Sequence, residues 1–171
     1  PDKIEFNQHI KKSSILFVGN LLNSKGLDIF ISTAKSLNKI EPNLEFIVTL
    51  HEPKDVIQKV KAFVSRELGA CIKVLGVVEN MADLVASVDI IVAPFRSTDG
   101  ISDTPIIVLE AMAMGKPVVA SNLAGIREAV VDGETGIILS ENNSDQLAFA
   151  INRLLNDYSL RQEMGKKAMV Q

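Results

Sequence analysis

Two charged side chains occupy positions at which a charge is unfavourable without a partner, and Lys25 is the first. It lies in the segment VGNLLNSKG, just before a helical pattern that begins at Leu27. The positive end of a helix dipole disfavours a cation unless an anion lies between them, so Lys25 is a candidate phosphate ligand. An ordinary surface lysine remains an equally good interpretation of the single pair Lys25-Gly26.

Glu110 is the second, because it is the only charged residue in the apolar run 106–114, within PIIVLEAMAMG. A carboxylate that faces a ligand crevice can accept two hydrogen bonds from vicinal hydroxyls, such as those of a ribose. The competing interpretation is a partly buried carboxylate that binds a neighbouring backbone group or a buried cation, since an unpaired buried charge is costly. Residue chemistry alone leaves both interpretations open.

The loop in front of Glu110 predicts an anion site. The segment FRSTDGISDTPIIVLEAMAMG runs from an apolar strand pattern through a small polar loop into a helix. Pro105 suits the first helical position, and Asp103 or Thr104 can cap the helix. The free N–H groups of the first turn, around Ile106 and Ile107, would then face the crevice, where a phosphate is a natural occupant.

Other nucleotide and metal chemistries lack their motifs. The sequence contains neither the GxxxxGK[ST] of a P-loop nor the GxGxxG of a dinucleotide fold, which argues against nucleotide hydrolysis and hydride transfer. Cys71 is the only cysteine, so a disulfide within the chain and a cysteine-based zinc cluster are both excluded. We therefore expect neither a metal ion nor any other cofactor.

These residues need a scaffold that brings distant loops together. Six apolar runs predict strands at 15–19, 44–50, 72–76, 89–95, 116–121 and 136–139. Their continuous Ile, Val and Leu content is typical of parallel strands that are buried on both faces. Because amphipathic helical patterns separate them, we predict a Rossmann-like, doubly wound α/β sheet of about six strands. Such sheets bind ligands outside the carboxyl ends of their strands, where Lys25 and the loop before Glu110 fall.

Composition narrows the class of partner and the setting. The 171 residues are 47% hydrophobic, enough for one domain with its own core, and the net charge is −3. Because Lys and Arg are scattered, we expect no nucleic-acid partner. No apolar run reaches the roughly 18–20 residues that span a bilayer, so we expect a soluble chain, and its single cysteine fits the reducing setting of the cytoplasm. The chain starts without Met and stops within a helical pattern, so we expect residues 1–171 to be a single domain excised from a longer protein.

Three segments together resemble a known family. They are ILFVGNLLNSKGLDIFI, KVLGVVENMADLVASVDIIVAPF and PIIVLEAMAMGKPVVASNLAGIREAVVDGETGIIL. In this order and spacing they resemble the donor-binding C-terminal domain of the retaining GT-B glycosyltransferases, a large group that includes sucrose synthase and many bacterial polysaccharide and lipid glycosyltransferases. The resemblance extends from about Ile15 to the C-terminus, and it implies the C-terminal half of a GT-B fold, with the N-terminal acceptor domain absent.

The resemblance implies roles for the candidate residues. Lys25 would contact the donor diphosphate and Glu110 would bind the ribose hydroxyls, and these two are the catalytic candidates. The main chain of residues 105–107 would meet the phosphates, and the loop 76–78 would hold the base mostly through its backbone. The implied donor-binding set is Gly19, Asn20, Lys25, Val77, Val78, Ser102, Asp103, Thr104, Ile106, Ile107 and Glu110.

Two positions depart from the family pattern. Asn20 stands where the family usually has an arginine, so a cation for the diphosphate would have to come from Arg96, Lys116 or the other domain. Ser102 stands where the family's first glutamate contacts the transferred sugar, and the adjacent Asp103 could substitute for it in a shifted register. The identity of the sugar is therefore open.

The resemblance implies a retaining glycosyltransferase that moves a sugar from a UDP-, GDP- or ADP-linked donor to a saccharide or lipid-linked acceptor, in polysaccharide or glycoconjugate biosynthesis. It also implies that protein cations replace a metal ion, and that any association with the cytoplasmic membrane face comes through the missing half. Two alternatives remain open: a sugar-nucleotide epimerase of GT-B architecture, and a degenerate, non-catalytic scaffold domain.

Overall fold

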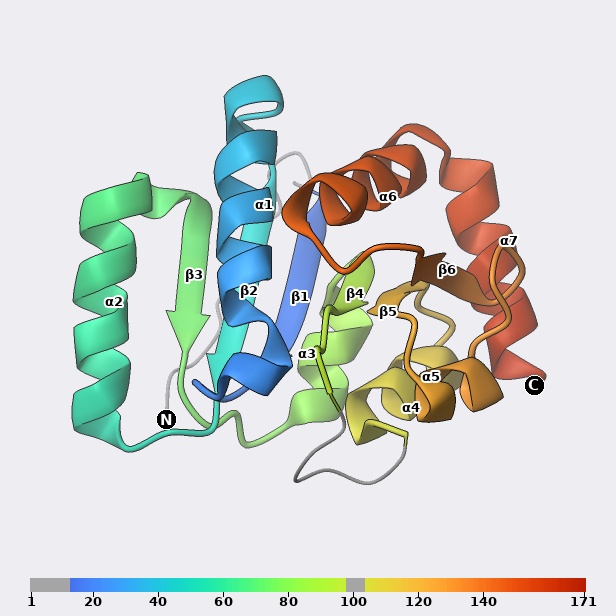
Figure 1. Ribbon diagram of the computed structural model, residues 1–171, viewed down its shortest axis with the longest axis horizontal. Coiled ribbons are helices and arrows are strands. Elements are labelled where there is room, and N and C mark those ends of the chain that lie inside the picture. Colours follow the sequence, from blue (N-terminus) through green and yellow to red (C-terminus); the bar gives the residue numbers. More distant parts are fainter. Residues whose placement is uncertain (1–12, 98–103) are drawn as a thin grey trace.

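The computed structural model describes residues 13–97 and 104–171. They form one sheet of six parallel strands in the order β3-β2-β1-β4-β5-β6 (Figure 1). The chain starts in the middle of the sheet, moves outward to β3, returns to β4 beside β1, and moves outward again to β6. This doubly wound order confirms the predicted fold class. The strands are β1 (Ser14–Gly19), β2 (Glu45–Leu50), β3 (Ile72–Leu75), β4 (Ile90–Ala93), β5 (Val118–Ser121) and β6 (Gly136–Leu139).

Helices connect the strands and cover both faces of the sheet. α1 and α6 pack against each other on one face, and α4 contacts α3, α5 and α7 on the other (Figure 1). Right-handed crossovers explain this division, because β2 and β5 lie on opposite sides of the β1–β4 pair. The helices are α1 (Leu27–Ile40), α2 (Lys54–Leu68), α3 (Met81–Ser87), α4 (Ile106–Ala113), α5 (Ala124–Ala129), α6 (Ser144–Asn156) and α7 (Tyr158–Met169), with 3-10 turns η1 (Asn23–Lys25) and η2 (Gly69–Cys71).

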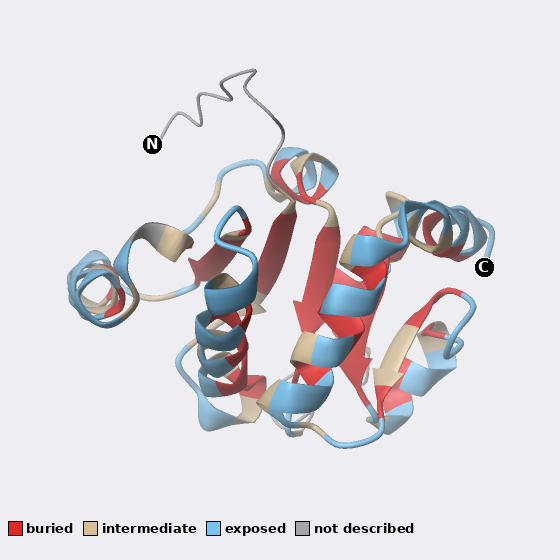
Figure 2. Cartoon of the chain, turned by 90° about the horizontal axis from the view of Figure 1, so that it is seen from above, coloured by how far each residue is buried: buried red, intermediate tan, exposed pale blue. Residues whose placement is uncertain are grey.

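The core lies along the central strands. Every residue of β4 and β5 is buried, because helices cover both faces in the middle of the sheet (Figure 2). Three aromatic rings join α1 to β1 and β2: the Phe30 ring centre lies 5.4 Å from that of Phe17 and 5.9 Å from that of Phe46. Burying each such ring stabilises the fold by roughly 1.5–3 kcal/mol. This packing fixes the positions at which the strands end.

The carboxyl ends of the six parallel strands form one edge of the sheet, the lower edge in Figure 1. The strand predicted at 89–95 is shorter than expected, since β4 stops at Ala93. Pro94 cannot donate to the next rung of the ladder, so the chain leaves the sheet there. Residues 94–97 therefore lie outside the sheet and run across its carboxyl edge toward the loop after β1.

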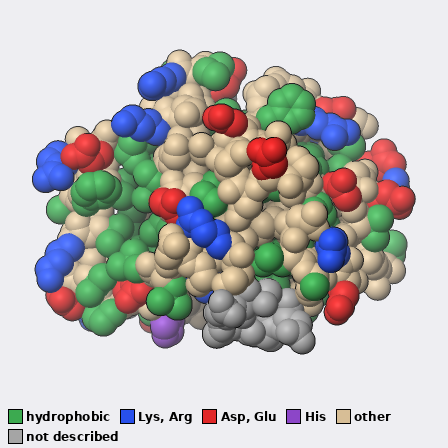
Figure 3. All heavy atoms as spheres, in the orientation of Figure 1, with side chains coloured by type: hydrophobic (Ala, Val, Ile, Leu, Met, Phe, Trp, Pro, Cys, Tyr) green, Lys and Arg blue, Asp and Glu red, His purple; other side chains and the backbone are tan. Residues whose placement is uncertain are grey.

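Charged side chains are spread over the surface. On the face in Figure 3, Lys and Arg lie among Asp and Glu, and no area of one sign dominates. Exposed ion pairs such as Lys59–Asp55 and Lys167–Glu163 lie one helical turn apart and contribute little stability each. Within residues 13–97 and 104–171, no helix is long and apolar enough to cross a bilayer.

Candidate functional site

Lys25 is a buried cation at the carboxyl edge of the sheet. It ends the turn η1, and only 6% of its surface is exposed. Its Nζ lies 4.9 Å from the centre of the Phe95 ring, a cation–π contact. Burial lowers the pKa of Lys25 below its usual 10.5. None of the described carboxylates pairs with Lys25, so the part of the chain that the structure describes supplies no counter-ion for its charge.

The start of the loop that carries Lys25 depends on Gly19 and Asn20. Gly19 ends β1, and a Cβ at this position would lie 2.9 Å from the Phe17 ring. The Oδ1 of Asn20 accepts a hydrogen bond from the N–H of Leu22 at 3.1 Å, which turns the chain away from the strand. Asn20 therefore shapes the turn and adds no charge to it.

The N-terminus of α4 lies at the same edge of the sheet. The helix begins at Ile106, and Pro105 is its N-cap, without a side-chain hydrogen bond. The N–H groups of Ile106 and Ile107 are the first of the helix, so no earlier turn supplies acceptors for them. The expected cap by Thr104 is wrong, because the Thr104 hydroxyl donates to the carbonyl of Gly125 in α5 at 2.8 Å.

Glu110 lies on the exposed side of α4. It shares an exposed stripe with Ile106 and Leu109, whose exposed fractions are 66% and 48%, whereas Val108 and Ala111 are buried. No ion pair joins Glu110 to another side chain in the described part of the chain. The interpretation in which it neutralises a buried cation is therefore wrong. What remains is an open carboxylate that a ligand can reach.

The loop after β3 lies apart from Lys25. Val77 is 70% exposed and Val78 is half-buried. Because β2 separates β3 from β1, the two loops are two strand spacings apart, about 10 Å. A ligand that touches both Lys25 and residues 76–78 must therefore be longer than a single phosphate group.

Both cations that were expected to replace the missing arginine already have partners within the fold. Arg96 binds Asp28 in a bidentate ion pair, with N···O distances of 2.7 and 2.6 Å. Lys116 lies at the opposite, amino-terminal edge of the sheet, where its Nζ donates to the carbonyls of Ala86 and Val88 at 2.6 and 2.7 Å. Lys116 is wrong as the substitute because it lies at the edge away from Lys25. Arg96 lies beside η1 at the edge of Lys25, where Asp28 engages it, and its contact with the diphosphate stays a prediction.

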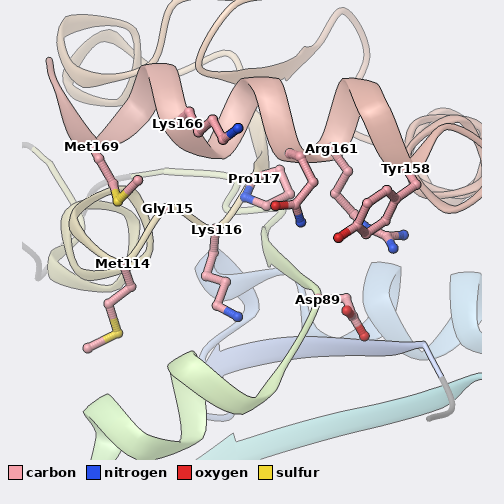
Figure 4. A pocket seen from close by; sticks show the side chains of 10 residues that line it. Asp89, Met114, Gly115, Lys116, Pro117, Tyr158, Arg161, Lys166 and Met169 are labelled. Carbon is pink, nitrogen blue, oxygen red and sulfur yellow. The ribbon is translucent and has the colours of Figure 1, made fainter.

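A pocket of about 340 Å³ lies at that opposite edge, between α7 and the segment that joins α4 to β5 (Figure 4). Arg161, one of the charged residues that line it, contacts the fold itself. The Arg161 guanidinium stacks 5.4 Å from the Tyr158 ring centre and donates to the carbonyl of Leu154 at 3.1 Å. Because this pocket lies across the sheet from Lys25 and from the N-terminus of α4, we place the candidate site at the carboxyl edge.

Asn142 is a residue of the site that sequence reasoning missed. It lies between β6 and α6, and its Nδ2 donates to the carbonyls of Pro94 and Phe95 at 3.1 and 2.9 Å. No motif marks it, and its one signal in the sequence is its place in a polar loop after a predicted strand. Only the fold brings it next to the loop after β4.

Two expectations about the site stay predictions. Ser102 and Asp103, the candidates for the contact with the transferred sugar, lie outside the described residues. Among residues 13–97 and 104–171, no three His, Cys, Asp or Glu side chains gather in a way that could hold a metal ion. Whether the reaction needs a metal is a question for experiment.

Comparison with known sequences identifies relatives of the chain. The sequence model of a family described as "Glycosyl transferases group 1" matches residues 12–157. The D-inositol 3-phosphate glycosyltransferase of Paenarthrobacter aurescens is 30% identical over 165 residues, which cover 90% of this chain and 38% of the relative. The alpha-D-kanosaminyltransferase of Streptomyces kanamyceticus is 27% identical, with coverage of 90% and 39%. The chain thus spans less than half the length of these relatives.

Solved structures share the fold. The C-terminal domain of a group 1 family glycosyl transferase from Francisella tularensis matches with a TM-score of 0.78 at 23% identity, covering 93% of this chain and 83% of that one. HepE of Anabaena, in complex with UDP-glucose, matches with a TM-score of 0.76 at 25% identity, covering 92% of this chain and 43% of HepE. The first likeness, at its low identity, concerns the fold alone.

Proposed function

The chain belongs to the glycosyl transferases group 1 family, and from this we propose that it binds the nucleoside-diphosphate sugar donor of a retaining glycosyltransferase. In the proposed reaction, the bond between the anomeric carbon and the diphosphate breaks through an oxocarbenium-like state. The oxygen of the acceptor hydroxyl then forms a bond to the same carbon on the face that the diphosphate leaves, and the hydroxyl proton passes to the departing diphosphate. The acceptor is a saccharide or a lipid-linked group, in polysaccharide or glycoconjugate synthesis.

The ammonium group of Lys25, buried and without an ion-pair partner among the described residues, is the observation that carries this proposal. As the sugar departs, negative charge grows on the diphosphate, and a cation fixed in a water-poor site stabilises that charge without reorganisation. The first N–H groups of α4, at the same edge, add to the positive field. A single preorganised donor contributes about 2.7–4 kcal/mol to an oxyanion hole, and we expect a similar order from Lys25.

Further features favour a nucleotide over a simple phosphate. Glu110 is an exposed carboxylate without an ion-pair partner among the described residues, as binding of ribose hydroxyls requires. Loop 76–78 lies about two strand spacings, roughly 10 Å, from the loop of Lys25, which suits a base at one end and a diphosphate at the other. A UDP-glucose complex of the 25% identical HepE supports the same class of ligand.

We propose that the acceptor site belongs to another part of the protein. The chain spans 38% and 39% of the two relatives named above, which leaves room for a second domain in proteins of their size. In this proposal an N-terminal acceptor domain completes the active site, the enzyme works in the cytoplasm, and Lys25 together with the α4 N-terminus takes the place of a metal ion.

Calorimetric titration of the 171-residue chain with UDP, GDP and ADP tests the proposal. We expect one of the three to bind, equally well with and without EDTA. Lys25→Ala and Glu110→Gln should each weaken that binding about tenfold or more, because each removes a partner of a charge-assisted hydrogen bond. Glu163→Gln, an exposed glutamate on α7, serves as the matched control and should bind like the original chain.

Circular dichroism melting of each variant checks that the fold is intact. If none of the three nucleotides binds to the folded chain, the donor-binding function is refuted and the scaffold alternative gains support. If both site variants bind as tightly as the original chain, the assignment of Lys25 and Glu110 fails. An epimerised free donor produced by the full-length protein would instead identify an epimerase.

A further inference from the structure

Three loops interlock around Lys25, and Arg96 joins two of them. Its backbone N–H donates to the carbonyl of Ser24 at 2.7 Å. Its Nη1 donates to the carbonyl oxygen and to Oδ1 of Asn23, at 2.8 and 3.0 Å. Ser24 and Asn23 belong to η1, the three-residue turn that ends in Lys25. Arg96 therefore holds this turn from the side of β4.

The same guanidinium also reaches α1, through its bidentate pair with Asp28. The hydrogen bond from Arg96 lowers the pKa of Asp28 and raises that of Arg96. With 34% of the Arg96 side chain and 64% of the Asp28 side chain exposed, the pair contributes little to folding. Its effect is geometric, because a bidentate pair fixes the orientation of the guanidinium as well as its distance.

Asn142 binds the segment after β4 that carries the Phe95 ring, on which the ammonium group of Lys25 lies. Its two hydrogen bonds to the carbonyls of Pro94 and Phe95 fix the backbone that carries the Phe95 ring. Its Oδ1 is buried and has no hydrogen-bond partner in the described part of the chain, which costs stability. Rotating the amide would turn that oxygen toward the two carbonyls, so this orientation is selected by the contacts to residues 94 and 95.

Gly26 makes the loops touch directly. It has a left-handed φ of 70°, and a Cβ at this position would overlap the carbonyl oxygen of Pro94. The carbonyl that Asn142 binds therefore also abuts the residue after Lys25. A shift of Pro94 would move the turn that carries the lysine.

From these contacts we propose that Arg96 and Asn142 are positioning residues, which together hold the ammonium group of Lys25 at the donor site. Arg96 fixes the turn on which the lysine stands, and Asn142 fixes the Phe95 ring that the ammonium group contacts. The inference rests on the proposed function, because the donor diphosphate is the group that this lysine would bind.

A ligand-free measurement tests the positioning directly. In the 171-residue chain with ¹³C-labelled lysine, NMR titration measures the pKa of Lys25. The signal of Lys25 is assigned as the one that disappears in Lys25→Ala. In Arg96→Gln and Asn142→Ala we expect the pKa of Lys25 to move back toward 10.5, since a loosened turn lets water reach the ammonium group. Arg66→Gln, which removes an arginine–carboxylate pair on α2, is the matched control and should leave it unchanged.

A double-mutant cycle tests the consequence for the ligand. Using whichever of UDP, GDP or ADP binds, Arg96→Gln alone should weaken binding by up to the loss seen in Lys25→Ala, about tenfold, because Arg96 acts only through Lys25. In a Lys25→Ala background the same change should have no further effect, because Arg96 then has nothing to position. Independent, multiplying effects would overturn the proposal.

Asp28→Asn separates positioning from direct contact. If Arg96 positions Lys25, Asp28→Asn weakens nucleotide binding because the ion pair is lost. Arg96→Lys then weakens binding as well, because lysine keeps the charge but lacks the bidentate fork. If Arg96 binds the diphosphate itself, releasing it from Asp28 tightens binding and Arg96→Lys retains most of it. That second pair of results would refute the positioning role.

The two proposals fail in different ways. If the original chain binds none of the nucleotides, the donor-binding function is lost, while the titration of Lys25 still decides whether Arg96 and Asn142 hold the lysine. If the original chain binds a nucleotide and the folded Arg96 and Asn142 variants bind it equally well, with the pKa of Lys25 unchanged, only the positioning inference is refuted.

Discussion

Lys25 and Glu110, the two charged residues of the candidate site, differ in how far they are buried. Lys25 is buried without a counter-ion among the described residues, whereas Glu110 is exposed on α4. The lowered pKa of Lys25 means that the unfolded chain binds more protons than the folded one between that pKa and 10.5. Folding stability contributed by this group therefore rises with pH across that interval. A bound anion would reverse the effect by favouring the charged form.

This linkage predicts a pH dependence of nucleotide binding. Affinity should fall as the pH rises through the lowered pKa of free Lys25, because the neutral amine no longer attracts the diphosphate. Starting near pH 8 keeps the titration of the terminal phosphate out of the profile. Calorimetry over pH 8–11 measures the decline. Lys25→Ala should bind weakly at every pH without that decline; the same decline in the variant would assign it to another group.

At the scale of elements, the fit of α7 against the rest of the domain depends on two glycines. Gly165 in α7 faces Gly115, which follows α4 and has a left-handed φ of 66°. A Cβ at Gly165 would overlap the carbonyl oxygen of Gly115, which is backbone and cannot rotate away. The helix therefore lies close to the α4–β5 connection, and this contact helps to hold the helix that carries Glu110.

Gly165→Ala should destabilise the domain even though alanine favours helices. The gain in helix propensity is about 1 kcal/mol, and overpacking against backbone falls at the upper end of its usual range, about 2–3 kcal/mol, so we expect a net loss of roughly 1–2 kcal/mol. Urea unfolding measures the change. Ser159→Ala, at an exposed position of the same helix, should change the free energy of unfolding by no more than about 0.5 kcal/mol. A Gly165→Ala variant as stable as this control would mean that α7 shifts freely.

At the scale of the whole molecule, the domain presents one functional edge. The loops after β1, β3 and β4 and the N-terminus of α4 all lie at the carboxyl ends of the strands, and the pocket beneath α7 lies at the other end (Figure 1, Figure 4). Several large apolar side chains of these loops and of α4 are exposed there: Leu21, Leu22, Val77, Ile106 and Leu109. An acceptor domain that closes over this edge would cover them.

The proposed division of labour predicts that the 171-residue chain binds donor but transfers no sugar. The full-length protein should transfer the label from a radiolabelled nucleotide sugar to its acceptor, and the chain alone should release no more label than a blank. The expectation follows because the proposal places the acceptor site in another domain of the protein. Transfer by the chain alone would contradict it.

The sequence by itself determined the fold class and the edge at which to search. Continuous runs such as 15–19 and 89–95 predict strands buried on both faces, because only a parallel sheet covered on two sides needs them. The chain order of strands and helices then places the loops of Lys25 and Glu110 at the carboxyl edge. Local patterns suffice here, since burial on two faces and helical periodicity are both written in consecutive residues.

Only the tertiary structure decided which charges are available. Arg96 and Lys116 looked alike as candidate cations, but Asp28, 68 positions from Arg96, and the carbonyls of Ala86 and Val88 near Lys116 engage them both. The sequence also did not show that Glu110 is exposed, or that Asn142 donates a hydrogen bond to the carbonyl of Pro94, 48 positions away. A side chain's partner depends on which distant segments the folded chain brings within about 3 Å, and no local pattern encodes that distance.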